Sequence, residues 1–220
     1  MTSAIRFLFD YVSPYAYLAS TQIRALARRH ARDVEAAPVL FAPMLDTTGS
    51  RGPAEVPSKR AYMFKDVERL ARMLGVPVEP PATHPFNPLT ALRVTRCVPA
   101  GEDRWRVVDA LYAATWVRGL RVDQPDVVAR VASEAGADGA ALLQRAASTE
   151  AKDGLRTATE EAIAAGVFGV PTMLVDGELF WGVDSLQLLE RFLGGERAMD
   201  AERLERWRRV TPSATRRPTS

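Results

Sequence analysis

Hydrophobic residues at the start of the chain follow first a strand pattern and then a helical one. Residues 5–9 form an apolar run, Ile-Arg-Phe-Leu-Phe, which is typical of a buried strand. Residues 14–30 carry leucine and isoleucine at helical spacing, behind a proline at the first helical position. Residues 33–41 return to a strand pattern. This order predicts a strand, a helix and a second strand that runs parallel to the first.

Helical patterns dominate the middle of the chain. A loop bearing glycine, proline and serine is expected at 45–57, and Ser58 is expected to cap the helix that follows it. A proline-rich connection at 75–88 leads into residues 89–165, where the apolar patterns are helical. One stripe in this segment, which we expect in the core, consists of Trp105, Val108, Leu111, Tyr112 and Thr115.

Strand patterns return towards the C-terminal end. Residues 172–175 and 179–181 flank Asp176-Gly177, a dipeptide that favours a two-residue hairpin turn. A last helix is expected to start at Asp184 and to stop at the glycines 194–195. The predicted order is therefore β-α-β, a helical insertion, and β-β-α.

Composition and charge narrow the classes of function. The chain has 220 residues, 47% of them hydrophobic, which suits one soluble domain. It has no long uncharged apolar stretch, so we expect no membrane partner, and Asp10 interrupts the first apolar run too early for a signal peptide. The net charge of +2 hides a C-terminal group of arginines: Arg203, Arg206, Arg208, Arg209, Arg216 and Arg217. We expect a solvated helix face and a disordered end there, and no nucleic-acid partner.

Cysteine and histidine are both scarce. The single cysteine, Cys97, excludes an internal disulfide and hence a dithiol oxidoreductase, and it fits a reducing cytoplasm. Because Cys97 lies in a helical pattern, we expect a packed core residue rather than a nucleophile. His30 and His84 are interpreted as surface polar residues, so neither is an obvious catalytic base, and no metal site is predicted.

The junction between the first strand and the first helix carries the most distinctive chemistry. Residues 10–17 read Asp-Tyr-Val-Ser-Pro-Tyr-Ala-Tyr, which places Ser13 at the start of a helix. Helix N-termini carry partial positive charge and unpaired N–H groups, so a hydroxyl there can help to hold an anion such as a thiolate. The alternative is that Ser13 only caps the helix, with Pro14 at its first position.

Four further segments follow this junction in the order typical of one family. They read Pro57-Ser-Lys-Arg-Ala-Tyr-Met63, Asp66-Val-Glu-Arg69, Pro85-Phe-Asn-Pro-Leu-Thr-Ala-Leu-Arg93 and Gly166-Val-Phe-Gly-Val-Pro-Thr-Met-Leu-Val-Asp-Gly-Glu-Leu-Phe-Trp-Gly182. With the Ser13 junction, they resemble the kappa-class glutathione transferases and the 2-hydroxychromene-2-carboxylate isomerases over residues 5–194. These proteins are relatives of the DsbA-like oxidoreductases in which serine replaces the first redox cysteine.

The resemblance implies an α/β fold, namely a thioredoxin-like (DsbA-like) core with an all-helical insertion subdomain. The core would comprise residues 1–60 and 166–195, and the insertion residues 61–165. Residues 196–220 would form an arginine-rich C-terminal extension. The resemblance leaves open whether the chain is a homodimer.

The resemblance also implies the residues of a thiol site. Ser13 would be the catalytic hydroxyl that holds the thiolate, and the Val170-Pro171 bond would be cis, which frees the Val170 backbone to pair with a peptide-like thiol. The resemblance implies that the cofactor is glutathione or another low-molecular-weight thiol, and the implied ligands of this thiol are Ser13, Ser50, Lys59, Val170, Pro171 and Asp184. The implied ligands of the substrate are Tyr15, Lys59, Asn87 and Arg93. Two of these residues have plainer alternatives, since Asp184 could cap the last helix and Lys59 could be an exposed lysine.

The activity implied by the resemblance is isomerisation of a small aromatic substrate, similar to 2-hydroxychromene-2-carboxylate, through transient addition of a thiolate. The alternatives are a kappa-like glutathione transferase and a non-catalytic thioredoxin-like binding protein. The chain departs from the family at Ser185 and Ser50, where the family usually has arginine and asparagine. Both changes remove polar contacts to the ends of a thiol cofactor, so we expect weak binding of glutathione or a preference for another small thiol.

Overall fold

The computed structural model describes residues 3–196 and 200–214 and contains a four-stranded mixed sheet. The strands β1 (Ile5–Phe9), β2 (Val34–Pro38), β3 (Thr172–Val175) and β4 (Glu178–Trp181) lie in the order β2-β1-β3-β4. β1 pairs with β2 in parallel, with Ile5 opposite Val34, whereas β3 runs antiparallel to both of its neighbours. The predicted βαβ unit is confirmed, because α1 (Pro14–Arg29) connects β1 and β2.

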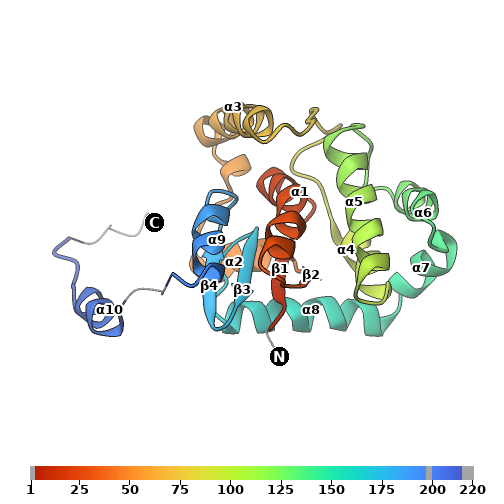
Figure 1. Ribbon diagram of the computed structural model, residues 1–220. Coiled ribbons are helices and arrows are strands. Elements are labelled where there is room, and N and C mark those ends of the chain that lie inside the picture. Colours follow the sequence, from red (N-terminus) through yellow and green to blue (C-terminus); the bar gives the residue numbers. More distant parts are fainter. Residues whose placement is uncertain (1–2, 197–199, 215–220) are drawn as a thin grey trace.

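Nine further α-helices and one short 3₁₀ helix, η1, follow α1 in the part of the chain that the structure describes (Figure 1). They are α2 (Phe41–Thr48), η1 (Pro53–Glu55), α3 (Pro57–Leu74), α4 (Leu89–Cys97), α5 (Glu102–Trp116), α6 (Pro125–Glu134), α7 (Gly139–Ala146), α8 (Thr149–Ala164), α9 (Leu186–Leu193) and α10 (Ala201–Arg208). The expected hairpin is present between β3 and β4. Asp176 and Gly177 both have positive φ, as a two-residue turn of this kind requires.

The two faces of the sheet pack against different helices. Side chains alternate between the faces of a strand, so Phe7 and Phe9 lie on one side of β1 and Leu8 on the other. The first side belongs to the large core, which includes residues of α1, α5 and α9. The second side packs with Met44 of α2 and Ala162 of α8. In Figure 1, α8 runs from α7 back towards the strands.

The large core continues without a break from the sheet into the helical segment, which comprises residues 57–164. Trp105 of α5 is fully buried, stacks on Phe7 and donates its indole N–H to the carbonyl of Val34 at 2.9 Å. The expected core stripe of α5 is confirmed, since each of its members is buried. Aromatic side chains therefore join α5 directly to β1 and β2.

Three of the predicted boundaries are wrong. The strand predicted over 33–41 ends at Pro38, and α2 begins within it and occupies part of the expected 45–57 loop, until Gly49 ends it in the left-handed conformation. Ser58 is not the N-cap of α3, because α3 starts one residue earlier, at Pro57, and its N-cap is Val56. The last helix starts at Leu186 rather than at Asp184, so Asp184 is not its N-cap.

The C-terminal arginines lie partly on a solvated helix, as expected. Every residue of α10 is exposed, including Trp207, and Asp200 caps the helix by accepting from the Glu202 N–H at 2.9 Å. The predicted disordered end falls mainly on 215–220, outside the described residues. Within the described ranges, no helix is both long and apolar enough to span a membrane.

Candidate active site

Ser13 lies where β1 turns into α1, and its hydroxyl makes two contacts. The oxygen accepts the N–H of Ala16 at 3.2 Å, so Ser13 is the N-cap of α1. The hydroxyl also faces the carbonyl oxygen of Val170 at 3.4 Å. The capping interpretation is therefore correct, and the structure also brings Ser13 to a residue 157 positions away in the chain. A hydroxyl with one long, weak donor bond can turn towards a ligand with little loss.

The Val170-Pro171 bond is cis, as expected. The segment lies directly before β3, and the carbonyl of Pro171 accepts the N–H of Gly182 at 2.9 Å, which ties the start of β3 to the end of β4. Asp184 follows Gly182 in the turn between β4 and α9, and it is exposed. Burial is the main reason why the pKa of Tyr15 is raised, and the negative charge of Asp184 acts in the same direction.

A buried carboxylate, Asp10, lies directly after β1 at the start of the turn that carries Ser13, and it was not identified from the sequence. Asp10 is 1% exposed and accepts the N–H groups of Val12 at 3.1 Å and Phe41 at 2.9 Å. Burial raises the pKa of Asp10 to about 7, although both backbone bonds act in the opposite direction. In the sequence, Asp10 was visible only as a charge that interrupts an apolar run.

His84 is not a surface polar residue, and that interpretation is wrong. Its ring packs edge-on against Phe64 and Trp116, with centroid distances of 5.5 and 5.6 Å, and its Nε2 lies 2.9 Å from the carbonyl oxygen of Val12. Sequence reasoning missed this because the proline-rich loop folds back onto the turn. His30, in contrast, is the C-cap of α1, and its Nε2 lies 3.8 Å from Oε1 of Glu190.

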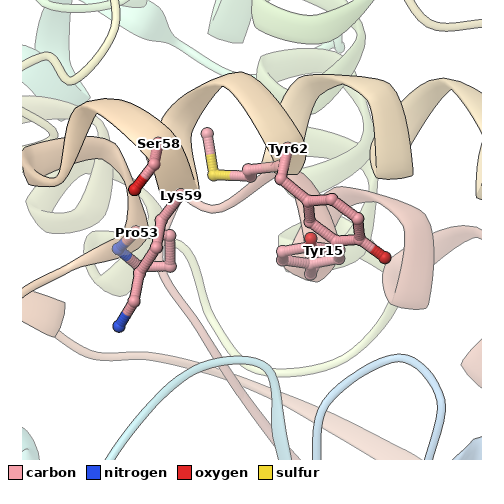
Figure 2. Close-up of a pocket in the computed structure, with 6 residues that line it drawn as sticks. Tyr15, Pro53, Ser58, Lys59 and Tyr62 are labelled. Atoms are coloured by element: carbon pink, nitrogen blue, oxygen red, sulfur yellow. The ribbon is translucent and has the colours of Figure 1, made fainter.

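A cavity of about 330 Å³ opens beside the start of α1, between α1 and α3. Its lining residues are Tyr15, Pro53, Ser58, Lys59, Tyr62 and Met63. Figure 2 shows Lys59 extending past Pro53 and the ring of Tyr62 next to that of Tyr15. The Tyr15 hydroxyl donates to Asp66 at 3.0 Å, and burial together with this bond raises the pKa of Tyr15. Lys59 and Tyr15, which were predicted to share a pocket, thus line the same one.

The remaining predicted site residues lie outside this cavity. Asn87 is exposed, and its side-chain oxygen accepts the N–H of Leu89 at the start of α4. Arg93 is half-buried on α4, and its Nε has no hydrogen-bond partner among the described residues. Ser50 is exposed just after α2. None of the three is hydrogen-bonded to Ser13 within residues 3–196 and 200–214.

Cys97 packs partly against the large core at the end of α4, and burial raises the pKa of its thiol. A raised pKa keeps the thiol protonated, which agrees with a packing role rather than a nucleophilic one. Across the described ranges, no three His, Cys, Asp or Glu side chains gather closely enough to hold a metal ion.

Comparison with known proteins agrees with this architecture. Residues 4–194 match the family described as the DSBA-like thioredoxin domain. The chain is 33% identical to a 2-hydroxychromene-2-carboxylate isomerase of Sphingobium xenophagum, over 88% of this chain and 99% of that one. It is 24% identical to human glutathione S-transferase kappa 1, over 86% and 90% of the two chains.

Solved structures give the same result. A 2-hydroxychromene-2-carboxylate isomerase superimposes with a TM-score of 0.81 at 27% identity, covering 93% of this chain and 97% of the other. A probable DsbA oxidoreductase of Streptomyces coelicolor, at 18% identity and a TM-score of 0.66, shares the fold over 96% of this chain and 93% of its own. This chain therefore belongs to the DsbA-like thioredoxin family, in the branch that contains the 2-hydroxychromene-2-carboxylate isomerases and the kappa-class glutathione transferases.

Proposed function

We propose that this protein is a thiol-dependent isomerase of an aromatic substrate similar to 2-hydroxychromene-2-carboxylate, with glutathione or another small thiol as cofactor. The observation that carries the proposal is the Ser13 hydroxyl at the N-terminus of α1, 3.4 Å from the carbonyl of Val170 and next to a cis-proline. The similarity to named isomerases over most of the chain supports the reaction class.

The interactions available at Ser13 are strong enough to stabilise a bound thiolate. Lowering the pKa of a thiol from about 8.5 to about 6.5 requires about 2.7 kcal/mol of differential stabilisation. A hydrogen bond from the Ser13 hydroxyl to a charged sulfur would supply about 1.5–3 kcal/mol. The N-terminus of α1 would add about 0.3–1 kcal/mol. Ser13 and the helix together are therefore sufficient, and Ser13 does not need to act as a nucleophile.

The other contacts of the thiol would come from the turn opposite Ser13. The backbone of Val170 can pair with the cysteinyl part of a peptide-like thiol, and Pro171 fixes that backbone. Asp184, exposed on the next turn, would face an α-ammonium group. Lys59 and Ser50 complete the proposed cofactor contacts.

The cavity between α1 and α3 would hold the substrate. Tyr15 and Tyr62 present aromatic rings to it, and Lys59 supplies a positive charge at its mouth for a substrate carboxylate. Asn87 and Arg93 are proposed as further substrate ligands. When bound, the thiol supplies a sulfur that adds reversibly to a conjugated carbon, which allows a bond of the substrate to rotate before the thiol is released. Ser13 holds the sulfur as an anion, and Tyr15 and Lys59 orient the ring.

The second candidate function is glutathione transfer, which the similarity to kappa-class transferases favours. The same site would serve it, but the product would remain a thioether. A non-catalytic binding protein is the third alternative. A reducing cytoplasmic location is part of the proposal, because the chain contains one cysteine and a thiol cofactor would stay reduced there.

Analysis of the products tests the proposal. The purified protein is incubated with glutathione and 2-hydroxychromene-2-carboxylate, and the products are separated by chromatography. We expect the trans-opened isomer, with glutathione recovered unchanged and a rate that depends on the thiol. A thioether product would favour the transferase, and the absence of any thiol-dependent rate would favour the binding protein.

A further inference from the structure

The loop between α3 and α4 places His84 against the turn that carries Ser13. The Nε2 atom of His84 lies 2.9 Å from the carbonyl oxygen of Val12, the residue directly before Ser13. A carbonyl oxygen can only accept, so Nε2 must carry the proton. The other ring nitrogen, Nδ1, is buried and has no hydrogen-bond partner in the described part of the chain.

The ring of His84 is held from several elements. Phe64 of α3, Phe86 of the same loop and Trp116 of α5 surround it at centroid distances of 5.5, 6.5 and 5.6 Å. Arg60 of α3 donates to the His84 carbonyl at 3.0 Å. Burial lowers the pKa of His84, and the charge of Arg60 acts in the same direction. The imidazole therefore stays neutral near pH 7, with one donor directed at Val12.

The peptide that links Val12 to Ser13 is fixed at both of its polar ends. Its carbonyl oxygen faces His84, and its N–H, which belongs to Ser13, donates to the carbonyl of Asp10 at 3.1 Å. The neighbouring carbonyl of Tyr11 accepts the indole N–H of Trp116 at 3.0 Å. Two side chains of the helical segment thus hold the turn on which the Ser13 hydroxyl is mounted.

We propose that His84 is a positioning residue, whose Nε2–H donor fixes the Val12–Ser13 peptide and so holds the Ser13 hydroxyl in place at the N-terminus of α1. The effect of this on catalysis rests on the proposed function of Ser13. The effect on the turn itself does not, because it concerns only contacts within the chain. The two can be measured separately.

Two variants separate the donor from the ring. His84→Phe keeps a ring in the aromatic pocket but removes the donor, whereas His84→Gln removes the ring but keeps an N–H donor at the position of Nε2. His30→Phe, at the opposite end of α1, is the matched control. Amide hydrogen exchange at Ser13 reports on the turn without any ligand. The ultraviolet absorbance of bound glutathione thiolate against pH, together with kcat, reports on the thiol.

We expect His84→Phe to speed exchange at the Ser13 amide, to raise the pKa of the bound thiol and to lower kcat at least about tenfold, since a small misplacement of a catalytic group has effects of this size. His84→Gln should recover most of each loss, and His30→Phe should change none. Unchanged exchange in His84→Phe, or losses in His84→Gln as large as in His84→Phe, would overturn the positioning role. If amide exchange is faster in His84→Phe but Ser13→Ala has normal activity, the positioning role of His84 is supported. The proposed function of Ser13 is then contradicted.

Discussion

The Ser13 hydroxyl makes two bonds, and its removal has two separable consequences. The bond from the Ala16 N–H caps α1, so Ser13→Ala should lower the free energy of unfolding by about 0.5–2 kcal/mol. The second consequence concerns activity. At neutral pH the loss of a donor to a charged sulfur should lower kcat by about ten- to a hundredfold.

This loss of activity in Ser13→Ala should shrink as the pH rises, because the thiol then ionises without help. The measurement is the pH profile of kcat at a temperature well below unfolding. Ser20→Ala is the matched control, since Ser20 is another buried serine of α1 and its hydroxyl only donates to the carbonyl of Tyr17. A loss in Ser13→Ala that is equal at all pH values would contradict the thiolate-holding role.

Asp10 should make stability depend on pH. Its pKa is about 7 in the folded chain, against an ordinary value of 3.8. Between these values the folded state binds the proton more tightly than the unfolded state, so stability decreases as the pH rises through this window and is level above it. The difference in pKa corresponds to about 4 kcal/mol at most.

Asp10→Asn should remove most of this slope, because an amide does not titrate. The measurement is the free energy of unfolding in urea at pH 5 and pH 8. Asp33→Asn, at an exposed aspartate before β2, is the control and should keep the slope of the unaltered chain. An equal slope in Asp10→Asn would show that Asp10 is not the source.

The sequence predicted the residues of the site whose roles are local and missed those that depend on tertiary contacts. Ser13 and the cis-proline at 171 belong to short motifs that can be recognised in the sequence, and the structure brings the Ser13 hydroxyl to the residue before that proline. Asp10 and His84 gain their properties from burial by distant elements, α2 for the first and α3 and α5 for the second. No local pattern reports such burial.

At the scale of elements, the periodicity of hydrophobic residues and the turn-forming residues predicted most of the order of helices and strands. An apolar run without a clear periodicity led to a wrong boundary. The hairpin at Asp176-Gly177 follows from residues that accept positive φ. The run around Phe41, in contrast, is apolar enough for either a strand or a helix. It becomes the start of α2 because its N–H bonds to the carboxylate of Asp10, a contact that the sequence does not reveal.

The C-terminal helix should be dispensable. No residue of α10 is buried, and each of its described ion pairs is formed within the helix and its flanking residue Arg209. Truncation after Glu196 should therefore leave both the melting temperature and the turnover unchanged. Calorimetry and the isomerase assay check this. A lower melting temperature or lost activity would mean that the segment packs against another copy of the chain.

At the scale of the whole molecule, the shared core predicts cooperative unfolding. Trp105 connects α5 to both β1 and β2 and also lies under the guanidinium of Arg24, at 4.7 Å. Trp105→Ala should lower the free energy of unfolding by about 3–5 kcal/mol. It should still unfold in one transition, because the sheet and the helical segment lose the same contact. Trp207→Ala, on exposed α10, is the control. Two separate calorimetric transitions would show that the helical segment is an independent domain.

Binding of glutathione should stabilise the whole molecule only modestly. In the proposed site, Ser13, Val170 and Asp184 would serve the sulfur and the α-ammonium group, but the carboxylate end would find fewer partners. Ser185 is buried and donates to the carbonyl of Gly182, and Ser50 stands where the family usually has asparagine. Each missing charge-assisted contact weakens affinity by about one to two decades. We therefore expect a dissociation constant in the millimolar range.

Thermal shift measurements distinguish this expectation from tight binding. With about 10 mM glutathione, a dissociation constant of about 1 mM stabilises the folded state by about 1.4 kcal/mol, and one of about 1 μM by about 5.5 kcal/mol. For a chain of this size these values correspond to increases in melting temperature of about 3–6 °C and about 10–20 °C. S-methylglutathione is the control, because it keeps the peptide but cannot form a thiolate. An increase in the higher range would mean that other residues hold the carboxylates. Equal shifts with the two ligands would mean that Ser13 contributes nothing to binding through the sulfur.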